Sequence, residues 1–162
     1  MPAGNTFEAI ATQTLGSAAA SVTFSSIPST YTDLVLVVTG TVSLADNVTL
    51  RFNGDSGSNY SWTYLAGTGS SAISGRSANT TSILTAGLGT TTIANTIWHI
   101  QNYSNSTTNK TVLNRGGRAD DGVVGWVGLW RNTTSITSLT VGAGAGNLST
   151  GSTFSLYGIA AA

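Results

Sequence analysis

The sequence has no cysteine and very few side chains that could perform chemistry. Its 162 residues include one His, six Lys plus Arg and six Asp plus Glu, so the formal net charge at pH 7 is zero. The absence of Cys excludes disulfides, thiolate zinc sites, iron–sulfur clusters and a cysteine nucleophile. A single His cannot form a multi-histidine metal centre. Six scattered basic residues at zero net charge predict no nucleic-acid partner.

Long apolar segments are missing as well. The longest apolar run, residues 34–38, is far too short to cross a bilayer, so we expect no membrane partner. Residues 1–20 lack a charged start followed by an apolar block, which predicts no secretion signal. Charged residues make up 7% of the chain, whereas Ser and Thr together supply about 30%. The chain is therefore polar but nearly uncharged.

Apolar residues recur with a period of two, which is typical of β-strands. Residues 48–52 show this alternation clearly, and the same pattern predicts strands over residues 7–14, 22–25, 59–65, 96–103, 110–119, 136–141 and 153–160. Residues 70–94, rich in Ser, Thr and Gly, are expected to form a long loop with one short strand near residues 82–85.

About ten short strands in one chain of this length predict an all-β fold, an antiparallel two-sheet sandwich that is jelly-roll-like. We expect residues 1–162 to form a single β-sandwich domain, in which residues 1–6 are a flexible N-terminal arm.

Two predicted strands are apolar on both faces. Residues 34–38 are all Leu or Val, and around residue 126 Trp126 and Trp130 face one way while Val127 faces the other. Such strands lie centrally in a sheet, with protein covering both faces.

Gly128 lies between the two Trp residues and has no side chain, so it leaves room for a close neighbour at that position.

The ionisable residues predict no catalytic constellation. Asp120 and Asp121 are adjacent, but neighbours in an extended chain point to opposite faces, and the following Gly122 favours a hairpin turn. His99 is accompanied by no Gly-x-Ser-x-Gly nucleophile elbow, so a structural role is the better interpretation. We therefore expect a protein that is not an enzyme.

Oxygen-bearing side chains cluster around residue 55. Asp46, Asn53, Asp55 and Asn59 carry the hard ligands that calcium prefers, but the spacing lacks the terminal Glu of a helix-loop-helix calcium site. Turn capping by these side chains is the better interpretation. We expect no metal and no cofactor.

Aromatic residues at alternate positions allow two interpretations. Tyr60, Trp62 and Tyr64 share one face of a predicted strand, as Trp126 and Trp130 do on another. Aromatic rows on a sheet can stack sugar rings. More often they form the core of a sandwich or a subunit contact, because each ring buries a large apolar area.

Five phrases, taken in order, resemble a known group of proteins. They are IPSTYTDL at 27–34, LRFNGDSGSNYS at 50–61, QNYSNSTTNK at 101–110, GLWRNTTSITSL at 128–139 and GSTFSLYGI at 151–159. Their order and spacing are similar to those of small structural proteins of tailed bacteriophages, cyanophages in particular. These proteins are met as capsid decoration (cement) proteins or as fibre-associated modules, and the group offers no catalytic residues to carry across.

The resemblance implies a virion protein at the capsid surface, assembled in the host cytoplasm, that binds the coat shell and stabilises it. The expected coat partner is the major capsid protein. The neutral charge and the doubly apolar strands predict that the chain also associates with two further copies of itself, in a homotrimer. Interfaces of this kind use aromatic and Arg anchors, and Trp126, Trp130 and Arg131 are the candidates. The alternative is a tail fibre or spike component that binds host surface glycan through the row at residues 60–64.

Overall fold

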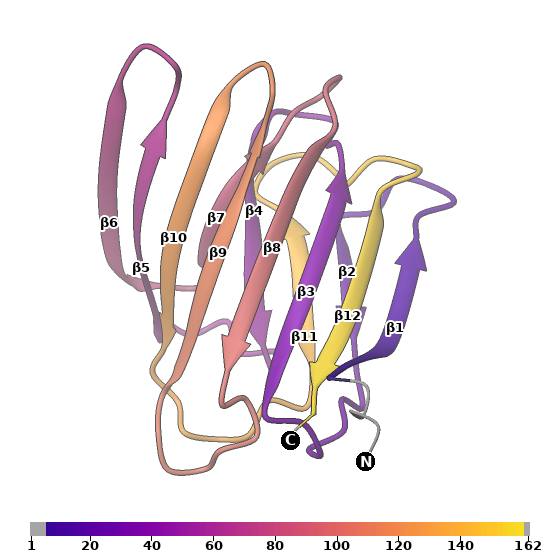
Figure 1. Cartoon of the computed structure of the whole chain (residues 1–162), viewed down its shortest axis with the longest axis vertical. Coiled ribbons are helices and arrows are strands. Elements are labelled where there is room, and N and C mark those ends of the chain that lie inside the picture. Colours follow the sequence, from indigo (N-terminus) through magenta and orange to yellow (C-terminus); the bar gives the residue numbers. More distant parts are fainter. Residues whose placement is uncertain (1–5, 161–162) are drawn as a thin grey trace.

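The computed structural model describes residues 6–160, which form two antiparallel β-sheets packed face to face (Figure 1). The large sheet contains β1 (Phe7–Thr14), β3 (Asp33–Gly40), β5 (Tyr60–Gly67), β6 (Ala72–Thr80), β8 (Ala94–Gln101), β9 (Lys110–Arg118), β10 (Gly122–Trp130) and β12 (Thr153–Ile159). The small sheet contains β2 (Ser21–Phe24), β4 (Asp46–Phe52), β7 (Ile83–Leu88) and β11 (Leu139–Ala143). The predicted all-β sandwich is confirmed. Residues 1–5 of the predicted N-terminal arm lie outside the described residues.

If two hairpins of the large sheet are set aside, each sheet contributes four of the remaining eight strands. The large sheet has the order β1-β12-β3-β8-β9-β10-β5-β6 and the small sheet the order β2-β11-β4-β7. The chain therefore changes sheet at every step from β1 to β5, then between β6 and β7, β7 and β8, β10 and β11, and β11 and β12. The remaining four strands are two hairpins, β5–β6 and β9–β10. They lie side by side at one end of the large sheet, where β7 lies behind β9 and β10 and β6 forms the outermost strand (Figure 1).

The short strand expected near residues 82–85 is confirmed by β7, but the loop expected before it was wrong, because residues 72–80 form β6. β6 pairs with β5 along its whole length, and β7 pairs with β4. β6 is an edge strand built mostly of small and polar residues. Because neither of its faces is covered by a second layer, it carries no apolar alternation that would mark it as a strand.

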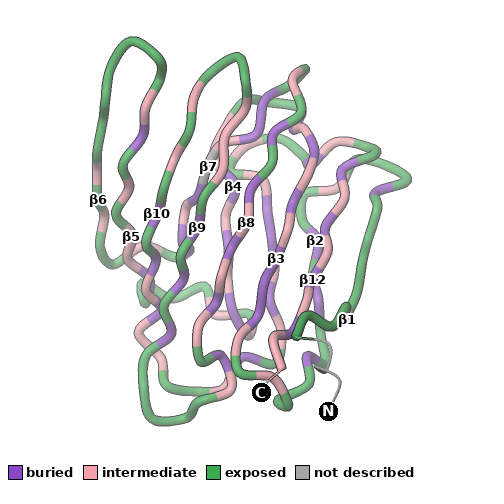
Figure 2. Tube along the Cα trace, viewed as in Figure 1, coloured by how far each residue is buried: buried purple, intermediate pink, exposed green. Residues whose placement is uncertain are grey.

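The core lies between the sheets and takes apolar residues from both layers, and Figure 2 shows buried positions along strands of both sheets. Its largest side chains are less than 2% exposed and include Trp98, Trp130, Tyr60, Tyr103, Phe52 and Phe154. β10 comes close to β7 here, since a Cβ added at Gly128 would lie 2.6 Å from Cγ2 of Ile83. The room predicted beside Gly128 is thus filled by the small sheet.

One cationic side chain is fully buried at the start of β9. The Lys110 ammonium donates hydrogen bonds to the carbonyl oxygens of Asn105, Thr108 and Thr133, at 2.6, 2.8 and 2.9 Å. Burial lowers the pKa of Lys110 below its ordinary value. Three carbonyl acceptors match the three N–H bonds of the ammonium, so Lys110 joins the loops at residues 105–108 and 133 to the end of the sheet.

Candidate functional site

The face of the large sheet that points away from the small sheet, here called the outer face, carries a continuous row of mostly apolar side chains. Cross-strand pairing places one residue from each of five adjacent strands in this row: Val127, Leu113, His99, Val35 and Tyr157. Figure 1 looks onto this face, with the strands of the small sheet behind it.

Several large apolar side chains of the outer face are exposed to solvent. They are Phe7 (58%), Leu65 (65%), Leu113 (45%), Val123 (71%) and Val127 (51%). Depressions between them include one of about 370 Å³ lined by Phe7, Val35, His99, Leu113 and Ile159. Soluble monomers rarely expose broad apolar patches, and such patches mark surfaces that bind other molecules.

The outward surface of the small sheet has the opposite character. Thr23, Thr49 and Thr140 lie there, and the hydroxyls of Thr23 and Thr140 are hydrogen-bonded at 2.9 Å. Polar outward residues are the usual pattern for a sheet that has one face in water. The contrast makes the outer face, and not the small sheet, the candidate binding surface.

The expectation that the doubly apolar strands are covered on both faces was wrong for the single chain. β3 and β10 are indeed interior strands of the large sheet. The small sheet covers only their inner faces, so Val127 and Val123 of β10 remain exposed. The sequence therefore provides apolar side chains for a second layer that one copy of the chain does not supply.

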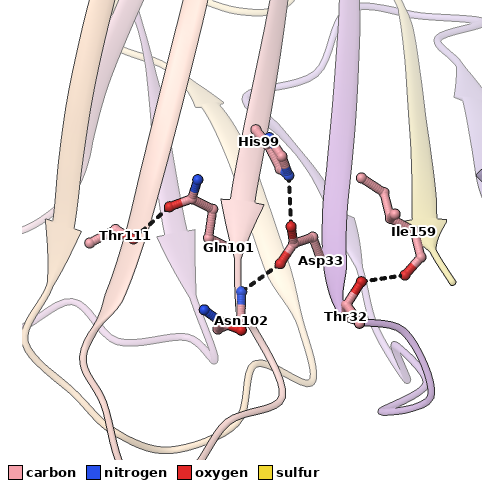
Figure 3. Close-up of polar contacts among 7 residues, drawn as sticks. All are labelled: Thr32, Asp33, His99, Gln101, Asn102, Thr111 and Ile159. Atoms are coloured by element: carbon pink, nitrogen blue, oxygen red, sulfur yellow. Dashed lines mark hydrogen bonds and ion pairs between the residues drawn. The ribbon is translucent and has the colours of Figure 1, made fainter. Parts of the chain in front are cut away.

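A polar pair interrupts the outer face near the ends of β3 and β8 (Figure 3). The Nε2 atom of His99 lies 2.9 Å from Oδ2 of Asp33, and the backbone N–H of Asn102 donates to Oδ1 of Asp33 at 2.8 Å. Figure 3 also shows Thr32 donating to the carbonyl oxygen of Ile159, at 2.9 Å. Within residues 6–160 no hydroxyl group hydrogen-bonds the imidazole of His99. The geometry fits a histidine that fixes the end of β8.

A second candidate site lies on the inner face, where β5 and β10 extend past the small sheet. Trp62, Tyr64 and Trp126 form a contiguous cluster there: the ring centroids of Tyr64 and Trp126 are 4.5 Å apart and stacked, and those of Trp62 and Trp126 are 4.9 Å apart, edge to face. These rings line a cavity of about 440 Å³ whose rim includes Asp46 and Asp121. We call this cavity and its lining the aromatic groove.

The predicted aromatic row is divided between the core and this groove. Tyr60 is completely buried, and its hydroxyl donates to the carbonyl oxygen of Asp55 at 3.1 Å and accepts from the Phe52 N–H at 3.1 Å. Burial raises the pKa of Tyr60 to about 12. Trp62 and Tyr64 lie beyond the edge of the small sheet and are only half-buried.

The three proposed interface anchors have three different environments. Trp130 is 1% exposed and packs on Phe52 and Tyr60, so its ring is not available to a partner and does not fit an interface role. Arg131 donates to Oγ of Ser61, to the carbonyl oxygen of Ser58 and to Oδ1 of Asn79, among other acceptors, which ties the ends of β5 and β6 together. Trp126 is 6% exposed and belongs to the aromatic groove.

The oxygen-bearing residues near position 55 are occupied by hydrogen bonds within the protein. The Asp55 carboxylate accepts from Nε1 of Trp130 at 2.7 Å, from the Gly57 N–H at 2.8 Å and from Nδ2 of Asn59 at 3.0 Å. The bond from Trp130 is the main reason that the pKa of Asp55 lies below its ordinary value. Oδ1 of Asn53 accepts from the backbone of residues 137 and 138. These contacts agree with the interpretation as turn capping.

The outcome for the Asp120–Asp121 pair agrees with the prediction of a turn. The two residues connect β9 to β10, and Arg118 is ion-paired with both, at 3.0 and 3.1 Å.

Comparison with known proteins assigns no family to the chain: no protein-family model matches it, and a search of curated proteins gave no match. No helix that could span a membrane occurs between residues 6 and 160.

Proposed function

We propose that this protein is a non-enzymatic bacteriophage virion protein, a capsid decoration protein that binds the coat shell through its outer face. The observation that carries the proposal is the exposed apolar row on a sheet whose other face already holds the core. This pattern supports a role in which the missing second layer is another protein. The sequence resemblance to phage structural proteins is the reason for proposing a phage capsid as the particle that this face binds.

The strand order supports a finer description of the fold as a jelly roll with two inserted hairpins. β1, β12, β3 and β8 in one sheet and β2, β11, β4 and β7 in the other have the alternating connections of two four-stranded layers. The hairpins β5–β6 and β9–β10 are then additions that widen one layer. Jelly rolls are common in viral capsid proteins and in lectins.

The proposed mechanism is the burial of the outer face against the coat protein. Burial of apolar surface contributes roughly 25 cal/mol per Å², and association through many copies adds the individual contacts together. The outer face carries the paired Asp33 and His99 and, in addition, two exposed arginines, Arg76 and Arg115, which cross-strand pairing places there. The partner surface is therefore expected to be mainly apolar, with acidic groups opposite the arginines. We also propose that the protein acts as a homotrimer at the junctions between coat subunits.

The test has two parts. Mass spectrometry and electron microscopy of purified particles should find the protein over the whole shell, in proportion to the coat protein. In binding assays with undecorated shells, Leu113→Glu and Val127→Glu should abolish binding, whereas Thr23→Glu on the small sheet should not. Absence from the particle, or equal binding by all variants, would overturn the proposal.

The alternative of a fibre or spike component gives a different distribution. A location confined to the tail would support it and exclude the decoration role. Sedimentation of the isolated protein tests the trimer, and a monomer at micromolar concentration would contradict it.

A further inference from the structure

We propose that the aromatic groove binds a neutral saccharide. This inference does not depend on the virion role, because the groove and the outer face lie on opposite faces of the large sheet. The volume of the aromatic groove, about 440 Å³, falls within the range of roughly 300–1,000 Å³ that is typical of ligand sites.

The floor of the groove is an aromatic platform. Tyr64 is stacked on Trp126 at 4.5 Å, and Trp62 meets Trp126 edge to face at 4.9 Å. The Tyr64 ring packs over Gly75 of β6, where any larger residue would clash with it, because a Cβ at that position would lie 2.7 Å from Cε1 of Tyr64. Trp62 and Tyr64 are half-buried, so the platform is neither closed into the core nor dispersed on the surface.

The packing of these rings selects among ligands that bind aromatic residues. A quaternary ammonium group needs several ring faces arranged around a space. Here the rings contact one another, so no such space exists between them. A platform of touching rings suits a ligand with an apolar face that can lie on it, which is what the C–H face of a sugar ring provides.

The rim of the groove supplies both hydrogen-bond acceptors and a hydrogen-bond donor. Asp46 and Asn47 come from the start of β4, and Arg118 and Asp121 from the β9–β10 turn. Arg118 is already ion-paired with Asp120 and with Asp121, so its charge is neutralised locally. The remaining carboxylate and amide oxygens accept hydrogen bonds from hydroxyl groups. They would repel phosphate and other anions.

A second observation separates the groove from ordinary packing. The indole N–H groups of Trp62 and Trp126 are buried, and neither has an acceptor among the described residues. Trp98 and Trp130, the core tryptophans, both donate: Trp98 to Oγ1 of Thr96 and Trp130 to Asp55. Unpaired buried donors are uncommon in folded proteins, and here both belong to the groove. Both N–H groups have almost no accessible surface, so the oxygen atoms of a bound sugar would accept from them only after the rings move apart.

The experiment titrates the full chain with a panel of methyl glycosides of glucose, galactose and mannose, and with N-acetylglucosamine. Tryptophan fluorescence and ligand-observed NMR report binding. We expect saturable binding of at least one sugar, weakened at least about tenfold by Trp62→Ala and by Asp121→Asn. Leu65→Ala, on the same strand but on the outer face, is the matched control and should bind as the unmodified protein does.

Three results would overturn the inference: no sugar in the panel saturates, Leu65→Ala weakens binding as much as Trp62→Ala does, or choline chloride or inorganic phosphate displaces the sugar. If Trp62→Ala does not fold, Asp121→Asn and Asn47→Ala at the rim decide the question. Sugar binding can fail while the protein still covers the shell, so this test and that of the proposed function have separate outcomes.

Discussion

At the scale of single residues, Asp55 links a surface turn to the core. Its carboxylate is the acceptor for the buried indole N–H of Trp130, and it also holds Gly57 and Asn59. We expect Asp55→Ala to lower the free energy of unfolding by about 2 kcal/mol, since the Trp130 donor is left without an acceptor. Urea unfolding followed by tryptophan fluorescence measures this loss. Asp121→Ala, an exposed carboxylate in a surface ion pair, should change stability by less than about 1 kcal/mol.

The effect of Asp55 should also depend on pH. Because its pKa is lowered in the folded protein, the unfolded chain takes up the proton first as pH falls. The stabilisation by Asp55 is thus present above the ordinary pKa of 3.8 and is lost as pH falls below it. The difference in stability between the unmodified protein and Asp55→Ala should shrink in acid, and a constant difference would contradict the assignment.

The contribution of Tyr60 to the free energy of unfolding should depend on pH in the opposite direction and at alkaline pH. Burial raises its pKa from 10.0 to about 12, so the neutral hydroxyl is favoured in the folded protein. Its contribution to stability is fully present below pH 10 and is lost as pH rises towards 12, by about 3 kcal/mol in total. Unfolding titrations across this range should show the decline.

Tyr60→Phe is the control for this prediction. The variant should lose most of the alkaline decline, and the remainder comes in part from Tyr103, whose pKa burial also raises. At neutral pH it should be less stable by about 1–2 kcal/mol, because the Phe52 N–H loses its acceptor. An unchanged alkaline decline in Tyr60→Phe would refute the role of this residue.

At the scale of the elements, the contact between β10 and β7 determines how closely the sheets approach. Gly128→Ala places a methyl group where Ile83 already lies, so we expect a loss of about 1–3 kcal/mol from overpacking. Ile83→Ala in the same chain should recover part of this loss, as a double-mutant cycle would show. Gly125→Ala is the matched control, since a Cβ there meets nothing within 4 Å. Equal effects of the two glycine substitutions would be inconsistent with the contact.

Most strands could be predicted because one of their faces is buried and the other is not. Residues 48–52 and 153–160 were expected as strands almost as they occur in β4 and β12, whose residues are alternately buried. β6 was missed because it is an edge strand of mostly small and polar residues with no buried face. β1 is equally exposed, and it was predicted from the pattern of its residues alone.

The candidate sites were harder to predict than the strands. Tyr60, Trp62 and Tyr64 share a face, and the sequence treats them alike. The small sheet ends between them, so Tyr60 lies in the core and the other two line a groove. Period-two alternation shows which residues point to the same face of a strand. How deeply each of them is buried depends on a strand of the small sheet, β7, that is distant in the sequence. For the same reason the apolar residues of β3 and β10 predicted burial on both faces without revealing that the small sheet covers only one of them.

At the scale of the whole molecule, the two surfaces of the sandwich should respond differently to solution conditions. If the outer face binds shells, as we propose, apolar area is buried and calorimetry should give a negative heat-capacity change. The affinity should fall only modestly as the NaCl concentration rises, because Arg76 and Arg115 are the exposed charges of a face that is otherwise mainly apolar. A steep loss of affinity in salt would indicate that charged groups carry the contact.

The pairing of β1 with β12 has a consequence for how the protein is made. Phe7 pairs with Ile159, and Val22 of β2 pairs with Val141 of β11, so β1 and β2 find their neighbours only after residues 139–159 have left the ribosome. Until then the apolar residues of β1 and β2 stay exposed on the nascent chain. Topologies dominated by such distant contacts acquire their structure slowly, in about milliseconds to seconds. Folding of the sandwich is therefore expected to follow the synthesis of these residues and not to accompany it.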